Sequence, residues 1–187
     1  ENILNANGIK NTFTINNGII ENSESINFNK VRVFKDKYHI RGDEKVILWA
    51  GRLSKAKGLD QVLLILNRLI ENNYRFRLLV VGKDVINNEK LNNNVISTGW
   101  LSEEEMRVVY EVSDLVIVPS IYPDPFPTVV LESMQSGTPV VATCFGGANE
   151  AVVNGKTGLI INPFNIDEFF ESVLKIIDNP QISDEMS

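Results

Sequence analysis

Cysteine and histidine are nearly absent from this sequence, with one of each in 187 residues. Cys144 has no second cysteine to pair with, which excludes an internal disulfide and favours a cytoplasmic compartment. Long apolar runs are also lacking: none approaches the roughly 18 residues of a membrane span, and no signal peptide is visible. His39 is interpreted as a surface residue, and no spacing typical of metal ligands stands out, so we expect no metal site.

Positive charge is scarce as well. Lysine and arginine number 18 against 24 aspartate and glutamate residues, which gives a net charge of −6. No basic stripe stands out, and this argues against nucleic acid as the main partner. What the chain does have is 43% hydrophobic and 22% charged residues, the ordinary balance of a globular domain with enough apolar material for a core.

The two ends suggest a piece of a longer protein. The chain begins at Glu1 without an initiator methionine and ends in "DNPQISDEMS", which reads as the start of a further helix. Residues 1–44 show little periodicity and are interpreted as a lead-in from an absent upstream domain, with one strand at "TFTINNGI" (12–19). We expect residues 45–187 to form one domain that is truncated before its final helix.

From Lys45 onward, short apolar runs alternate with amphipathic stretches. The apolar runs predict buried parallel strands at 45–51, 76–82, 94–99, 115–120, 139–143 and 157–163. Helical spacing, a capping box formed by Ser102 and Glu105, and glycine or proline stops predict helices at 59–73, 102–114, 128–137, 147–155 and 165–179. This alternation predicts an α/β fold, a doubly wound, Rossmann-like parallel sheet with helices on both faces.

Ligands of such sheets bind beyond the carboxyl ends of the strands. The first loop at that edge is "GRLSKAKG", in which Gly51 opens a turn carrying Arg52 and Lys57. It lacks the terminal Gly-Lys-Ser/Thr of a Walker loop, but an arginine fork and a lysine point charge there suit an anion. The alternative is a solvated basic turn.

A second loop, "YPDPFPTVVLES", carries three prolines at 123, 125 and 127. Because proline restricts itself and the residue before it, Asp124 is held in place with little entropy left to lose on binding. Thr128 is the expected N-cap of the next helix, whose unpaired N–H groups near Val129 and Val130 favour a phosphate or sugar oxygen. Glu132 lies about one turn into that helix. The alternative is a proline-rich connector with two surface acids.

The third loop, "CFGGANEAVVNG", contains Gly146 and Gly147, which allow a ligand close to the backbone, and Glu150 at the start of the next helix. The alternative is a turn whose glycines only permit its geometry.

In combination these stretches resemble a known family. "GRLSKAKGLD", "LLVVG", "TGWLSEEEMRVVYEVSDLVIVPS", "DPFPTVVLESMQSGTPVVAT", "GGANE" and "NGKTGLI" occur in the order and spacing of the retaining glycosyltransferases of family 4. The resemblance covers about residues 12–178. It implies the C-terminal, donor-binding half of the GT-B architecture, which has two Rossmann-like domains.

By this resemblance, Arg52 and Lys57 hold the diphosphate of a nucleotide sugar. Asp124 is the catalytic-site acid that touches the donor sugar, and Glu132 holds the ribose hydroxyls. The remaining donor-binding positions implied are Gly51, Phe126, Pro127, Thr128, Val129, Gly146, Gly147 and Glu150. The implied base pocket consists of Gly82, Lys83, Trp100 and Leu101.

Two positions depart from the family's pattern. Asp124 stands where glutamate is usual, which shortens the acid by one methylene. Pro127 replaces the usual glycine after Phe126 and removes one backbone donor.

The resemblance implies transfer of a hexosyl group from a UDP-, GDP- or ADP-sugar to an acceptor hydroxyl, with retained anomeric configuration and no cofactor. The acceptor, a glycan or lipid, is expected on the missing N-terminal domain, so this chain alone should bind donor without transferring sugar. A cytoplasmic bacterial enzyme of cell-surface polysaccharide or glycolipid synthesis, with peripheral membrane contact, fits this. Two alternatives remain: an inactive sugar-nucleotide-binding module and a flavodoxin-like interaction domain.

Overall fold

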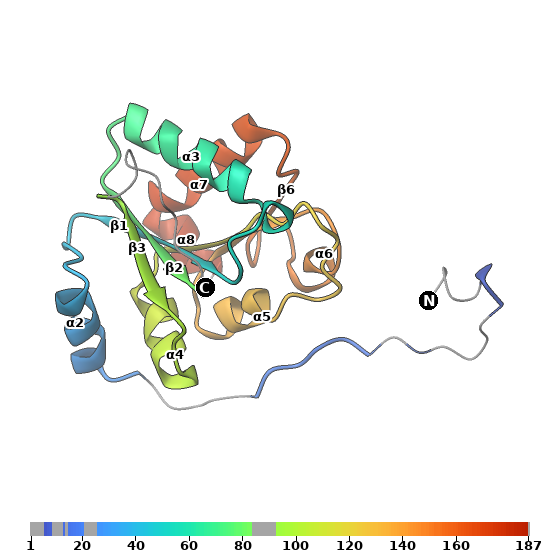
Figure 1. The fold of residues 1–187 in the computed structure, drawn as a ribbon, viewed down its shortest axis with the longest axis horizontal. Coiled ribbons are helices and arrows are strands. Elements are labelled where there is room, and N and C mark those ends of the chain that lie inside the picture. Colours follow the sequence, from blue (N-terminus) through green and yellow to red (C-terminus); the bar gives the residue numbers. More distant parts are fainter. Residues whose placement is uncertain (1–5, 9–12, 14, 21–25, 84–92, 187) are drawn as a thin grey trace.

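The structure, a computed structural model, describes residues 6–8, 13, 15–20, 26–83 and 93–186. Its centre is a six-stranded sheet with the order β3-β2-β1-β4-β5-β6, in which all paired strands are parallel (Figure 1). The strands are β1 (Lys45–Ala50), β2 (Phe76–Val81), β3 (Val95–Gly99), β4 (Leu115–Val118), β5 (Val140–Thr143) and β6 (Leu159–Ile161). The predicted fold class, a doubly wound parallel sheet, is confirmed.

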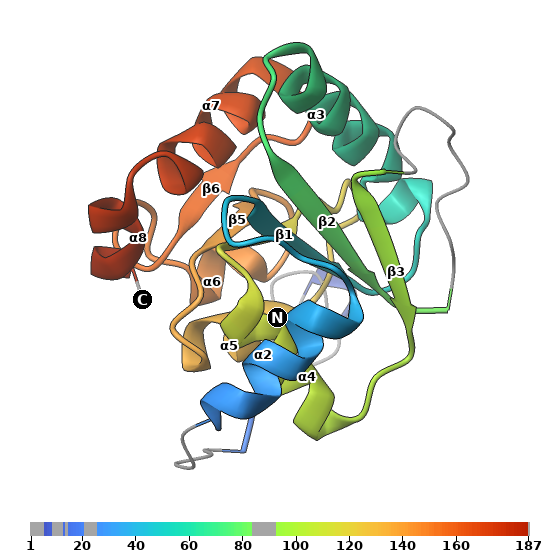
Figure 2. The ribbon, with the colours of Figure 1, turned by 90° about the vertical axis from the view of Figure 1, so that its left-hand side faces the viewer.

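Helices cover both faces of the sheet. One face carries α3 (Leu59–Glu71), α7 (Ile166–Ile177) and α8 (Pro180–Met186). The other carries α2 (Phe28–Lys37), α4 (Glu103–Val112), α5 (Thr128–Gln135) and the short α6 (Ala148–Ala151). Figure 2 shows α3 and α7 above the sheet and α2, α4 and α5 below it.

Strand β1 shows why the apolar runs are continuous. Ile47 and Trp49 enter the core beneath α3 and α7, whereas Val46 and Leu48 enter the core beneath α4 and α5. Successive side chains point to opposite faces of a strand, and both faces are covered here, so every position from 46 to 49 is buried.

The strand order places the carboxyl ends of β1 and β4 side by side. The chain winds from β1 through β2 to β3 on one side, and from β4 through β5 to β6 on the other. The order therefore reverses between β1 and β4, and this is the switch point at which such sheets bind ligands. The loops that follow these two strands are the ones with the unusual sequences.

The predicted elements from residue 45 onward are all present, with shorter ends. The Ser102 capping box is confirmed, because the Ser102 N–H donates to Glu105 Oε2 at 2.8 Å and the Glu105 N–H donates to Ser102 Oγ at 3.3 Å. The fourth and sixth predicted strands are shortened to β4 and β6, since the residues beyond turn away into loops.

The lead-in differs from its prediction. A strand was expected at 12–19, but residues 13 and 15–20 form none, and residues 12 and 14 lie outside the described residues. Instead, the segment contains α2, which is capped by the side chain of Asn27 and buries only Phe34. A helix with one buried residue leaves little apolar periodicity to detect. Because Phe34 lies in the core with Val108 of α4, a boundary at residue 44 does not separate α2 from the domain.

The C-terminal stretch was expected to hold only the beginning of a helix. It forms α8, and Met186 at its end is buried in the core beneath α3 and α7. Within the described part of the chain, no helix combines the length and the apolar character needed to cross a bilayer.

We expect Leu66→Ala in α3 to lower the free energy of unfolding by about 2–5 kcal/mol, because Leu66 is 1% exposed and its removal leaves a cavity. Leu64→Ala on the same helix is the matched control. Leu64 is 49% exposed, and its truncation should cost less than about 1 kcal/mol in urea unfolding. Equal losses for the two variants would contradict this assignment of the core face.

Candidate functional site

The loops after β1 and β4 are docked on each other through their main chains. The carbonyl oxygen of Ala56, in the short 3-10 turn Lys55–Lys57, accepts hydrogen bonds from the N–H groups of Ile121 (3.0 Å) and Tyr122 (3.2 Å). Gly58, at φ 86°, lies so close to β4 that a Cβ there would overlap the Pro119 carbonyl oxygen. The two loops that the sequence singled out therefore lie side by side.

The proline loop, residues 122–127, is also held from the side of β5. The Gly147 N–H donates to the Asp124 carbonyl oxygen at 2.8 Å. A Cβ at Gly146 would overlap that oxygen, and one at Gly147 would overlap the Pro125 carbonyl oxygen. These glycines therefore make room for the proline loop. This geometry matches the alternative in which they permit a turn, and their contact with a ligand stays a prediction.

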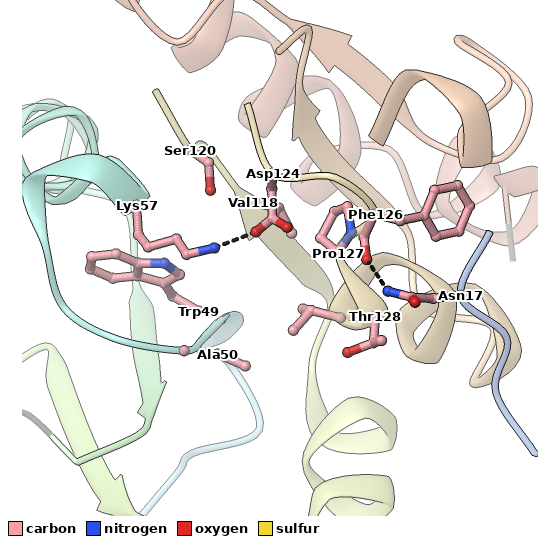
Figure 3. Close-up of a pocket in the computed structure, with 12 residues that line it drawn as sticks. Asn17, Trp49, Ala50, Lys57, Val118, Ser120, Asp124, Phe126, Pro127 and Thr128 are labelled. Atoms are coloured by element: carbon pink, nitrogen blue, oxygen red, sulfur yellow. Dashed lines mark hydrogen bonds and ion pairs between the residues drawn. The ribbon is translucent and has the colours of Figure 1, made fainter. Parts of the chain in front are cut away.

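A cavity of about 330 Å³ opens between the docked loops (Figure 3). The residues that line it come from the lead-in, the ends of β1 and β4, both loops and the start of α5: Asn17, Trp49, Ala50, Gly51, Lys57, Val118, Ser120, Asp124, Phe126, Pro127, Thr128 and Val129. Sequence reasoning placed Gly51, Lys57, Asp124 and the run 126–129 here, and the structure brings them together.

Lys57 and Asp124 are the single cation and the single carboxylate among these lining residues, and they form an ion pair across the cavity. Their side chains are 29% and 20% exposed, so the pair is partly shielded from water. Partial burial strengthens the attraction of each charge for a ligand that displaces its partner. The pocket therefore holds one positive and one negative side chain, and a charged ligand could replace either as the partner of the other.

The start of α5 supplies further donors. The helix begins at Thr128, and its N-cap is Pro127, which makes no side-chain cap hydrogen bond. The prediction that Thr128 is the N-cap was thus wrong by one residue. The Val130 N–H donates to the Pro127 carbonyl at 3.1 Å, whereas the N–H groups of Thr128 and Val129 have no hydrogen bond within the described part of the chain. A helix start with two unpaired N–H groups favours an anion.

The cavity lies at the switch point of a Rossmann-like sheet, where a lysine and the start of a helix both line it. The family described as "Glycosyl transferases group 1" matches residues 31–187 of this chain. The chain belongs to this family. The sheet is thus the Rossmann-like domain of a GT-B glycosyltransferase.

Curated relatives agree with the family. An uncharacterized glycosyltransferase of Methanocaldococcus jannaschii is 27% identical over 154 residues, which cover 78% of this chain and 39% of the relative. The lipopolysaccharide 1,2-N-acetylglucosaminetransferase of Salmonella typhimurium is 30% identical over 155 residues, covering 74% of this chain and 41% of the relative. The chain thus spans about two fifths of the length of these relatives.

Among solved structures, the Anabaena protein HepE in complex with UDP-glucose is similar, with a TM-score of 0.73 and 23% identity over 86% of this chain and 46% of that one. A variant of the S. aureus protein TarM, solved in complex with UDP, has a TM-score of 0.79 and 20% identity, covering 99% of this chain and 36% of that one. At these identities the likeness shows the shared fold.

Three predicted site residues of this glycosyltransferase domain lie away from the cavity. Arg52 is exposed and is not among the described residues that line it. Glu150 is exposed on α6. Glu132 faces α4, where its carboxylate accepts a hydrogen bond of 2.7 Å from the hydroxyl of Tyr110. The spacing of Asp124 and Glu132 in the sequence did not show that α5 directs the Glu132 side chain toward α4 and away from the cavity.

Glu132 lies instead in a second hollow of about 230 Å³ between α4, α5 and the lead-in. Burial is the main cause that raises the pKa of Tyr110 above its usual value, and the hydrogen bond to Glu132 adds to it. Tyr110 therefore stays protonated, and its hydroxyl donates a hydrogen bond to the Glu132 carboxylate. The arrangement holds Oε2 of the Glu132 carboxylate in place.

The predicted base pocket lies at the ends of β2 and β3. Gly82 is buried and donates its N–H to the Gly99 carbonyl at 3.1 Å, Lys83 is exposed, and Leu101 is half-buried. Trp100 is 75% exposed. Residues 84–92, which follow, lie outside the described residues. None of these four described positions lines the cavity beside Lys57.

Several residues that line the cavity were not predicted from the sequence, among them Trp49, Ser120 and Asn17. Trp49 is buried in the core beneath α3 and α7, and it also lines the cavity. Ser120 follows β4 closely, so its place beyond a strand end was a usable signal. Asn17 comes from a lead-in with no motif that points to the site. No group of three or more histidine, cysteine or acidic side chains suited to a metal ion is found in the described ranges.

We expect Gly147→Ala to destabilise the fold by about 1–3 kcal/mol, because the added methyl meets the Pro125 main chain and the proline loop must shift. Gly42→Ala is the control, since a Cβ there meets nothing within 4 Å. Thermal and urea unfolding measure both. Wild-type stability of Gly147→Ala would show that the loops are not packed as described.

Proposed function

We propose that this chain is the donor-binding domain of a retaining, family 4 glycosyltransferase, which transfers a hexosyl group from a nucleoside-diphosphate sugar to an acceptor hydroxyl. The observation that carries the proposal is a single cavity lined both by Lys57 and by Thr128 and Val129 at the start of α5. UDP-glucose in the complex of the Anabaena protein and the sugar transfer named for the Salmonella relative support this class of donor.

In this proposal the diphosphate lies between Lys57 and the start of α5. The ammonium group and the N–H groups of Thr128 and Val129 oppose the charge that grows on the leaving diphosphate. Arg52 approaches from the exposed rim as donor binds, because an exposed arginine can change its side-chain conformation freely. These groups provide the positive charge, so the proposal invokes no metal ion and no cofactor.

Asp124 takes the place beside the transferred sugar. Its ion pair with Lys57 keeps both groups at the cavity until donor arrives. A diphosphate oxygen then competes for Lys57, and the freed carboxylate faces the sugar, where it stabilises positive charge that develops at the anomeric carbon. The aspartate, shorter than the usual glutamate, still reaches the lysine across the cavity.

Glu132, oriented by Tyr110, binds ribose hydroxyls, and the base lies toward Gly82, Lys83, Trp100 and Leu101. Gly146, Gly147 and Glu150 form the outer wall beside the proline loop. The acceptor, a glycan or lipid, binds the remainder of a longer protein, so the isolated chain binds donor without transferring sugar. We place the enzyme in the cytoplasm of a bacterium, in cell-surface polysaccharide or glycolipid synthesis, with peripheral membrane contact.

We expect Lys57→Ala to weaken binding of the preferred nucleotide at least about tenfold, because the diphosphate loses a partly buried cation and meets an unpaired Asp124. Calorimetry with UDP, GDP and ADP and their sugars measures this. Lys55→Ala is the matched control: it removes the same charge from the same turn, at a side chain that is 82% exposed and paired with Asp60. Equal loss in both variants would indicate only a general charge effect.

In the complete protein, Asp124→Asn should lower kcat about 100-fold while the dissociation constant for nucleoside diphosphate stays equal or falls, because Lys57 is released from its partner. Asp60→Asn, at an exposed position of α3, should change neither quantity. A kcat like that of the wild type would remove Asp124 from the reaction. Donor binding by a complete wild-type protein without turnover would favour the second candidate, an inactive sugar-nucleotide-binding module, which the Asp124 and Pro127 departures suggest.

A further inference from the structure

The lead-in segment 15–20 lies against α5 and is attached near both ends of that helix. The Asn17 side chain donates its Nδ2–H to the carbonyl oxygen of Phe126 at 2.9 Å, just before the helix begins. Gln135, the last helical residue, donates its Nε2–H to the carbonyl oxygen of Ile20 at 2.8 Å. Figure 1 shows the lead-in passing beneath α5 on its way to α2.

The spacing of these two attachments agrees with the lengths of both segments. Three extended residues, from 17 to 20, span about 10 Å, and an eight-residue helix is about 12 Å long. The lead-in therefore runs alongside α5 in the same direction as the helix. It contributes Asn17 to the Lys57 cavity and Ile19 and Ile20 to the Glu132 hollow.

The Phe126 carbonyl needs a donor from outside the helix. The nearest helical candidate, the Val130 N–H, is used by the Pro127 carbonyl. Pro127 has no N–H, so the peptide group that joins Phe126 to Pro127 carries an acceptor and no donor. Left unpaired at the rim of an anion pocket, this oxygen would direct negative partial charge at the diphosphate. The Asn17 side chain donates a hydrogen bond to this oxygen and so reduces its negative partial charge. Because a carbonyl can only accept, the amide of Asn17 must turn its NH2 group, and not its oxygen, toward Phe126.

We propose that Asn17 is a positioning residue of the donor site: by holding the Phe126 carbonyl, it orients the Phe126–Thr128 backbone so that the unpaired N–H groups face the donor diphosphate (Figure 3). This inference rests on the proposed donor site. It extends that site into the lead-in, outside the sheet and its loops.

The alternative is that Asn17 only attaches the lead-in to α5, and this alternative predicts a different result for Asn17 variants. If Asn17 only fastens the lead-in, its loss changes local exchange at residues 15–20 and leaves nucleotide affinity alone. If it positions the loop, its loss weakens nucleotide binding and loosens the start of α5. A change of amide to carboxylate separates the two further, because Asn17→Asp has the same shape, cannot donate to the Phe126 carbonyl when ionised, and adds negative charge beside the diphosphate.

The experiment compares the wild-type chain with Asn17→Ala, Asn17→Asp and Asn16→Asp. Calorimetry with UDP, GDP and ADP gives the dissociation constants, and hydrogen exchange followed by mass spectrometry reports on peptides covering 121–131. Asn16→Asp is the matched control, since Asn16 is exposed, adjacent in sequence and absent from the described lining of the cavity. It adds the same charge one residue away.

We expect Asn17→Ala to weaken binding of the preferred nucleotide about tenfold and Asn17→Asp at least about thirtyfold, whereas Asn16→Asp stays within about twofold. Exchange at 121–131 should accelerate in both Asn17 variants only. Thermal unfolding should move by less than about 2 °C in all three, because position 17 is exposed.

Three results would overturn the inference. Equal affinities in the four proteins would show that Asn17 is only a tether. Weakened binding with unchanged exchange at 121–131 would show that Asn17 acts on the ligand and does not position the loop. Absence of nucleotide binding by the wild-type chain would overturn the proposed function, and this inference with it, and is distinguished from the first result by the wild-type titration alone.

Discussion

The site depends on one main-chain junction, in which the carbonyl of Ala56 receives the N–H groups of Ile121 and Tyr122 while Gly58 packs on Pro119. The junction exists because β1 and β4 are neighbours in the sheet although about 65 residues separate them in sequence. Without it, Lys57 and Asp124 would belong to two independent surface loops. With it, two side chains from distant parts of the chain form an ion pair beside a helix start, in one cavity at the edge of the sheet.

Charge in this pocket is nearly balanced by the protein's own side chains. The chain is acidic overall, yet its cavity contains one lysine against one aspartate, and the unpaired N–H groups of α5 tip the balance toward anions. A partly buried lysine without a partner would suffer a desolvation penalty, and Asp124 lowers it. In the proposed function, the same pairing makes donor binding an exchange of partners for Lys57, so that a phosphate bound to Lys57 also frees Asp124.

The sequence predicted the sheet well and the directions of individual side chains poorly. Strands buried on both faces appear as continuous apolar runs, so β1, β2 and β4 were predictable from these runs alone. Helix α2 was not, because a single buried phenylalanine makes no periodic pattern. Loop order and proline spacing located Lys57 and Asp124. They did not reveal that Glu132 turns to Tyr110, because helical phase relative to a neighbouring helix is a tertiary property. Asn17 carried no local signal, since its contact spans 109 residues.

The glycine turn after β5 separates the framework of the pocket from its reactive groups. Gly146 and Gly147 contact the proline loop through backbone atoms. The path of the loop is therefore set by main-chain packing and does not depend on the side chains at 124 and 126. The side chains at 124 and 126 can then change without altering the contacts that shape the loop. A side chain added at 146 or 147, in contrast, would meet the backbone of the loop directly and force the whole loop to move.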